Sequence, residues 1–152
     1  LQRGADVSLH ISSGVTALIV AAAYGFEKLV ELALRHGAEI NQQTTRGITA
    51  LMDAAWEGHE KVVGTLIRHG AAIDLQDNAG DTALSRAAFY GHLAALLCLL
   101  RAGADSTACD ASGRTALQLA KEQGHAECAR ALTEHAAAEK AAEKAAAEKA
   151  AA

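Results

Sequence analysis

The sequence predicts an all-α solenoid in which similar helix-turn-helix layers are stacked and the last helix continues as one long helix. The first observation is a period of 33 residues, marked by a glycine two positions before each Thr-Ala-Leu run: Gly14, Gly47, Gly80 and Gly113. The second is the composition, which is 51% hydrophobic but only 3% aromatic, so the apolar content is mostly Ala and Leu. Self-similarity at such a period indicates repeats that each contact only their neighbours.

A threonine is expected to begin the first helix of each layer, because its hydroxyl can accept from free backbone N–H groups of the first turn. These residues are Thr16, Thr49, Thr82 and Thr115. In the second layer, Leu51, Ala54 and Ala55 recur at the spacing of one helix face, which predicts that this face is buried. The same triad returns as Leu18, Ala21 and Ala22 and as Leu84, Ala87 and Ala88, and becomes Leu117, Ala120 and Lys121 in the fourth layer.

Second helices are predicted at residues 27–35, 60–68 and 93–101. Each precedes a glycine that can adopt the left-handed conformation that ends a helix, at Gly37, Gly70 and Gly103. An arginine stands in the last turn of each, where a cation suits the helix dipole.

This pattern, G-x-T-A-L-x-x-A-A-x-x-G-H followed by a second apolar run and H-G-A-x-I-[ND], resembles the ankyrin repeat from about residue 1 to 135. The chain departs from the family in having Ala where Pro usually follows the threonine. The resemblance implies repeats at 11–43, 44–76, 77–109 and 110–135, after a truncated half repeat at 1–10. Polar Lys121, Arg130 and Thr133 make the fourth repeat the expected C-terminal cap. The first repeat keeps apolar residues, so we expect a longer array or another covering group there. Self-association is expected through this uncapped repeat or through the terminal helix.

After residue 135 the repeat pattern stops, and residues 136–152 consist of Ala, Glu and Lys. These residue types favour helix, so one helix is predicted from about Ala126 to the C-terminal end. The segment resembles the Ala-Glu-Lys spacers used as semi-rigid linkers. We favour an engineered origin for it over a natural low-complexity tail.

Composition excludes several classes of function. The net charge of −4 provides no basic stripe for nucleic acid, and no apolar run approaches the about 20 residues of a membrane span. The first residues do not have the pattern of a signal peptide, so we expect none. Three cysteines, an odd number without metal-like spacing, favour a reducing intracellular compartment, the cytoplasm.

We expect no enzymatic activity, cofactor or metal. His59, His92 and His125 recur because the repeat recurs, and single imidazoles on successive layers are too far apart to share a zinc ion. His59-Glu60 begins like the zinc motif H-E-x-x-H, but position 63 is Val.

In ankyrin repeats, the partner commonly meets the turn tips and the exposed stripe of the first helices. Four of the five aromatic residues fall on this stripe, which favours a binding surface because aromatic side chains dominate interface energetics. The predicted partner-binding residues are Tyr24, Arg46, Ile48, Asp53, Trp56, Glu57, Asp81, Arg86, Phe89 and Tyr90. The alternative is that the aromatic rings pack between adjacent first helices. Asp53 and Arg86, one period apart, either pair with each other or orient a partner, and Phe26 is expected to be structural.

The predicted function is a non-enzymatic module that binds a protein or peptide through the turn tips and the concave first-helix stripe. The alternative is a structural scaffold or assembly subunit whose terminal helix sets spacing and whose stripe binds nothing specific. The identity of the partner does not follow from the fold.

Overall fold

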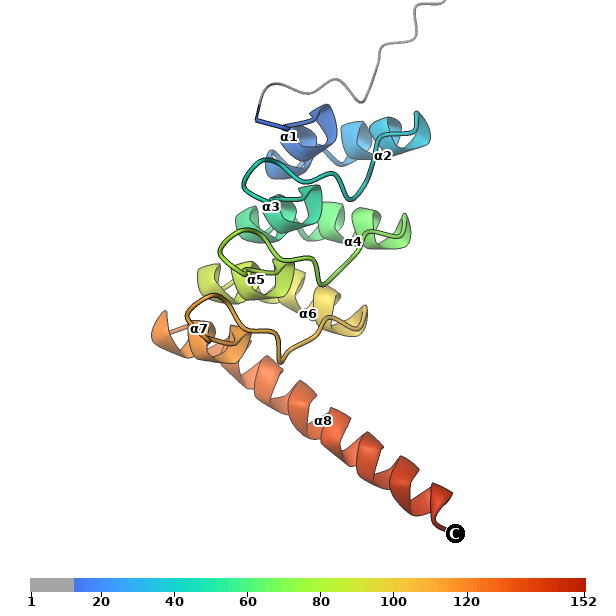
Figure 1. Cartoon of the computed structure of the whole chain (residues 1–152), viewed down its shortest axis with the longest axis vertical. Helices are drawn as coiled ribbons and strands as arrows, with labels where there is room; N and C mark the ends of the chain where they lie inside the picture. Colours follow the sequence, from blue (N-terminus) through green and yellow to red (C-terminus); the bar gives the residue numbers. More distant parts are fainter. Residues whose placement is uncertain (1–12) are drawn as a thin grey trace, which may run out of the picture.

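The computed structural model describes residues 13–152, so the predicted half repeat at 1–10 lies outside the described residues. The all-α prediction is confirmed. Within the described residues, four helix pairs stack in order and the last helix extends away from the stack (Figure 1). The helices are α1 Ala17–Ala23, α2 Glu27–Arg35, α3 Ala50–Glu57, α4 Glu60–Arg68, α5 Ala83–Tyr90, α6 Leu93–Arg101, α7 Ala116–Glu122 and α8 Ala126–Ala150.

The threonines begin the first helices as predicted. Each side-chain oxygen accepts from the backbone N–H three residues later, at 3.1 to 3.4 Å. Thr82 and Thr115 take part in full capping boxes, because the side chains of Ser85 and Gln118 accept in return from their backbone N–H groups. These caps satisfy donors that would otherwise be left free at the helix starts.

The predicted apolar faces form the core between layers. Leu51 is 2% exposed, and Ala54 and Ala55 are fully buried. Their small side chains let neighbouring first helices lie close together, so α1, α3, α5 and α7 form a continuous row. The predicted bounds of α2, α4 and α6 are also confirmed, and Gly37, Gly70 and Gly103 each have a positive φ after the helix end.

Histidines that open the second helices join successive layers. The His59 ring lies against Gly25 of the layer before, and its Nε2 is 2.9 Å from the Ala23 carbonyl oxygen. His92 lies in the same way against Gly58, where an added Cβ would come within 2.5 Å of Nδ1. The recurring histidines are therefore part of the layer-to-layer packing.

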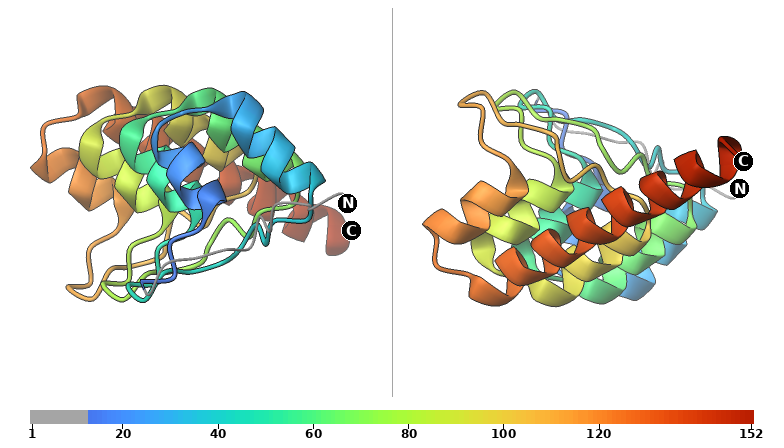
Figure 2. Two further views of the ribbon diagram at one scale, coloured as in Figure 1. Left: turned by 90° about the horizontal axis from the view of Figure 1, so that it is seen from above. Right: turned by 90° about the horizontal axis from the view of Figure 1, so that it is seen from below.

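The turns that connect the layers gather on one side of the helices (Figure 2). In the third layer, the Asp77 side chain accepts from the backbone N–H groups of Ala79 and Asp81, both at 2.9 Å. Backbone hydrogen bonds also link one tip to the next, from Asn78 N–H to the Arg46 carbonyl at 3.0 Å. The turn tips are thus held in register, which fixes the positions of the residues that they carry.

The two ends of the stack differ in polarity. On α2, Leu29 and Leu32 are 47% and 52% exposed, so this outer face stays apolar. At the other end, Lys121, Arg130 and Thr133 are all exposed, as expected for a polar cap. From residue 137 onward α8 is exposed along its whole length, which confirms the predicted helical extension. No helix among residues 13–152 is long and apolar enough to cross a membrane.

Candidate functional site

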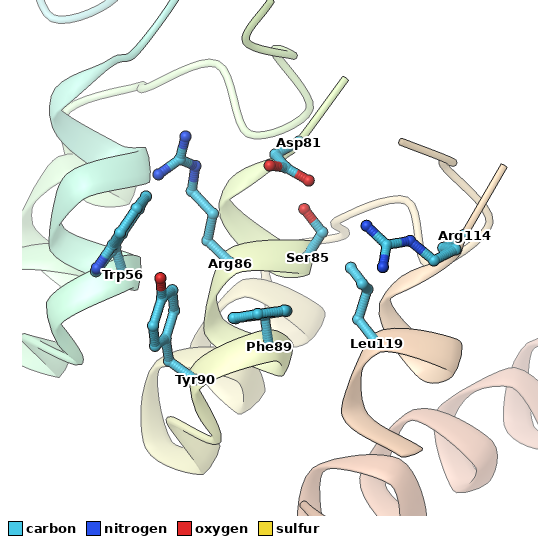
Figure 3. A pocket seen from close by; sticks show the side chains of 8 residues that line it. All are labelled: Trp56, Asp81, Ser85, Arg86, Phe89, Tyr90, Arg114 and Leu119. Atoms are coloured by element: carbon cyan, nitrogen blue, oxygen red, sulfur yellow. The ribbon is translucent and has the colours of Figure 1, made fainter. Parts of the chain in front are cut away.

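Two cavities lie between the turn tips and the first helices, and they are lined by almost all of the predicted site residues. The first, of about 300 Å³, lies between the first two layers and is lined by Tyr24, Arg46, Ile48 and Asp53 among others. The second, of about 160 Å³, is lined by Trp56, Asp81, Arg86, Phe89 and Tyr90, together with Ser85, Arg114 and Leu119 (Figure 3). Glu57 lines neither cavity and is exposed on α3.

The aromatic side chains contact one another across layers. Trp56 of α3 stacks on Tyr90 of α5 with 4.9 Å between ring centres, and Phe89 meets Tyr90 edge-on at the same distance. Packing between first helices therefore does occur. Tyr90 is nevertheless 40% exposed and Tyr24 is 69% exposed, so both rings also present area on the surface.

Arg86 was expected on the exposed stripe, but the structure buries it, and only 4% of the residue is exposed. Its Nη2 donates to Oδ2 of Asp77, and its guanidinium carbon lies 4.5 Å from the centre of the Trp56 ring. Asp77 and Trp56 give the cation a carboxylate and an aromatic face below the surface, which explains its burial. Asp53 and Arg86 form no ion pair with each other among residues 13–152, because Arg86 is paired with Asp77.

Two site carboxylates are half-buried and form no side-chain hydrogen bond within the described part of the chain. Burial is the main cause that raises the pKa of Asp53, and nearby Arg86 opposes this rise. Burial also raises the pKa of Asp81, the Asp77 carboxylate adds to the effect, and Arg86 again opposes it. Both carboxylates therefore lack part of the solvation that a charged group requires.

Ion pairs fix the turn of the fourth layer next to the second cavity. Arg114 Nε donates to Asp110 Oδ2 at 2.9 Å, and Nη1 lies 3.3 Å from Glu122. The backbone N–H of Arg114 also donates to Asp110, and this bond is the main reason that the pKa of Asp110 is lowered. Arg114 thus already has two carboxylate partners.

Some residues of this surface were not predicted. Ile19 and Ser85 line the cavities from the position three residues after the capping threonine, and Thr44 lines the first cavity from its turn. The shared offset of Ile19 and Ser85 from the capping threonine was the sequence signal that could have identified these two residues. Phe26, expected to be structural, is 56% exposed and stacks on Tyr24 with 5.9 Å between ring centres. No group of three or more His, Cys, Asp or Glu side chains that could hold a metal ion occurs among residues 13–152.

Comparisons with known proteins agree with the architecture. No match was found among curated proteins. A family model described as "Ankyrin repeats (3 copies)" matches residues 1–77 and 64–144. Ankyrin repeats are a general protein–protein interaction module, and the family is generally non-enzymatic. Since these matches span nearly all of the sequence and the stacked helix pairs have the same character, the chain belongs to the ankyrin-repeat family.

Proposed function

We propose that this chain binds a protein or peptide partner through the two cavities and the turn tips beside them. The observation that carries the proposal is the gathering of residues from successive layers: Tyr24, Arg46, Ile48 and Asp53 at one cavity and Trp56, Asp81, Arg86, Phe89 and Tyr90 at the other. We call this set, with Glu57 at its margin, the binding surface.

The chemistry of the binding surface suits protein recognition. Exposed Tyr24 and Tyr90 offer large apolar area with few rotatable bonds to fix, and such residues often dominate the energy of interfaces. Half-buried Asp53 and Asp81 would gain hydrogen bonds from a partner that replaces water. No catalytic step is included in the proposal.

Affinity capture tests this function. The whole chain is immobilised through its C-terminal end and exposed to a cell extract, in parallel with a Trp56→Ala/Tyr90→Ala variant. A Leu32→Ala variant is the matched control, because Leu32 is also exposed and apolar but lines neither cavity. The proposal expects a protein that is recovered with the wild type and the control but not with the double variant. Equal recovery with all three chains would place binding elsewhere.

A second function, that of a scaffold or assembly subunit, is favoured by α8 and by the outer face of α2. The exposed part of α8 extends beyond the stack, and we propose that residues 136–152 are an added rigid spacer. The apolar face with Leu29 and Leu32 offers a place for self-association. Replacement of residues 136–152 by a Gly-Ser segment should broaden the distribution of distances between a label at the chain end and a label on α4. Capture of the partner should stay unchanged. An unchanged distance distribution would count against a spacer.

The proposed setting is a reducing compartment, the cytoplasm. Cys98, Cys109 and Cys128 are unpaired in the structure. Burial raises the pKa of the Cys98 and Cys128 thiols, which keeps them in the unreactive protonated form. Free thiols of this kind suit proteins that work among cellular reductants.

A further inference from the structure

Arg86 has hydrogen-bonding capacity that the described residues do not use. The side chain is 95% buried and lines the second cavity, and its Nη2 is held by Asp77. Its Nε and Nη1 are buried and have no hydrogen-bond partner among residues 13–152. Buried donors are almost always satisfied in proteins, because an unpaired buried donor loses its hydrogen bonds to water without replacement. Because Arg86 also lines the cavity, an acceptor that enters it from outside the chain is the group placed to complete these two covered donors.

The charges around the cavity decide which acceptor fits. Three carboxylates lie near the Arg86 cation: Asp77 is bonded to it, and Asp53 and Asp81 are near enough that the cation opposes the rise in pKa that their burial causes. Arg114 also lines the cavity, but it is paired with Asp110 and Glu122, so the cluster stays negative and a carboxylate from a partner would be repelled. A lysine or arginine would meet the N–H groups of Arg86 with its own positive charge. Neither kind of ion satisfies both sides of the cavity.

We propose that the second cavity accepts the side-chain amide of an Asn or Gln from the bound partner. The amide oxygen accepts from Nε and Nη1 of Arg86, and the amide NH₂ donates to the unpaired carboxylate of Asp81. A neutral group with both an acceptor and a donor matches this wall without adding charge. This inference rests on the proposed function, because it specifies the partner of the same surface.

The size and lining of the cavity agree with an amide. Its volume of about 160 Å³ equals that of roughly five water molecules in the liquid, enough for a carboxamide with part of its stem. Phe89 and Tyr90 provide apolar walls, and the Arg86 guanidinium lies between Trp56 and Asp81 in the view of Figure 3. The unpaired N–H groups lie below the surface, so the amide enters the cavity. Tyr90 lines the cavity and is 40% exposed, and its ring is the part that we expect to move aside.

Nuclear magnetic resonance of the whole chain tests this inference with three small probes of similar shape. Propionamide, propionate and propylammonium are titrated while the Arg86 Nε–H and Trp56 indole N–H signals are followed. Of these three probes, only propionamide is expected to cause a saturable shift of the Arg86 signal. N-Methylacetamide serves as the fourth probe, because it imitates a backbone amide, and it should bind more weakly since it has a single N–H on a substituted nitrogen.

Asp81→Asn is the decisive variant, because the Asp81 side chain forms no hydrogen bond in the described structure and its loss should not prevent folding. Propionamide should bind about fivefold more weakly to it, since the charged acceptor of the amide NH₂ is replaced by a neutral amide oxygen. The discrimination against propionate should shrink at the same time, a change that a purely structural role of Asp81 would not produce. Arg86→Lys should abolish the response to propionamide, and its folding is checked by circular dichroism.

Several results would overturn the inference: no shift of Arg86, stronger binding of propionate or propylammonium, stronger binding of N-methylacetamide, or an unchanged response in Asp81→Asn. None of these results would contradict partner capture that depends on Trp56 and Tyr90. The failure of the amide site and the failure of the proposed function are therefore distinguishable.

Discussion

The guanidinium carbon of Arg86 lies 4.5 Å from the centre of the Trp56 ring, so an arginine of α5 covers a tryptophan of α3. The same arginine is held by Asp77 at the base of its own turn, and Trp56 in turn stacks on Tyr90. This chain of contacts joins two layers of the array at the binding surface. Residues that we propose to bind a partner therefore also support the stack, and their variants need separate measurements of folding and binding.

Trp56→Ala should keep the helical fold and lose a moderate part of its stability. The variant removes the cation–π contact with Arg86 and the stack on Tyr90, a loss of about 1–3 kcal/mol. Chemical unfolding and far-ultraviolet circular dichroism measure the two quantities, with Phe26→Ala as an aromatic control outside both cavities. Loss of the helical signal at room temperature would show that the ring is part of the core.

Arg86→Met should destabilise the chain by about 3 kcal/mol, because it leaves the buried Asp77 carboxylate without its cation. Adding Asp77→Asn should recover part of this loss, since the unpaired charge is removed while an oxygen remains for the turn N–H groups. Arg114→Met is the control: its side chain is 41% exposed, so the expected loss is about 1 kcal/mol or less. If Arg86→Met lost no more stability than Arg114→Met, the ion pair between Arg86 and Asp77 would not stabilise the fold.

Asp53→Asn should raise the melting temperature at pH 7, by on the order of 1 °C. The folded-state pKa of Asp53 lies above the ordinary value of 3.8, so its contribution to stability is fully present below pH 3.8 and is lost as the pH rises through the folded-state pKa. The difference between variant and wild type should therefore vanish below pH 3.8. Melting curves across this pH range, with exposed Glu39→Gln as the control, measure the effect. A variant that is less stable than wild type at pH 7 would refute it.

Gly58→Ala should destabilise the stack more than Gly70→Ala. Both glycines have a positive φ, +74° and +85°, so both substitutions carry the backbone strain of about 1–2 kcal/mol. An added Cβ at Gly58 also meets the His92 ring at 2.5 Å, whereas at Gly70 nothing lies within 4 Å. Adding His92→Ala to each variant should reduce the difference between their free energies of unfolding, as measured by chemical unfolding. Equal losses from the two glycines would mean that the histidine contact contributes little to stability.

Much of the fold could be predicted because the period assigns each residue to a position in its layer. The threonines marked the starts of α1, α3, α5 and α7, and the glycines marked the ends of α2, α4 and α6. The shared offsets explain why the predicted surface residues line common cavities. A position alone does not give the direction of a long side chain. Arg86 forms an ion pair with Asp77, nine residues earlier in the sequence. Its periodic counterparts, Asp53 and Leu119, are different residue types, so the period does not predict this contact.

Phe26 shows the second limit of the periodic argument. In later layers the corresponding histidine lies against a glycine of the layer before, as His59 does with Gly25. In the first described layer Phe26 instead stacks on Tyr24 and remains exposed. Its surroundings depend on neighbours in space that the period does not specify.

The most direct test of the account is the affinity of the captured partner, measured by isothermal titration calorimetry with wild type, Tyr90→Ala and Leu32→Ala chains. Tyr90 is exposed at the edge of the second cavity, whereas Leu32 is exposed on the outer face of α2. The account predicts that Tyr90→Ala weakens binding by about 2 kcal/mol, roughly thirtyfold, while Leu32→Ala leaves it unchanged. Equal affinity for Tyr90→Ala and wild type, or a loss confined to Leu32→Ala, would contradict it.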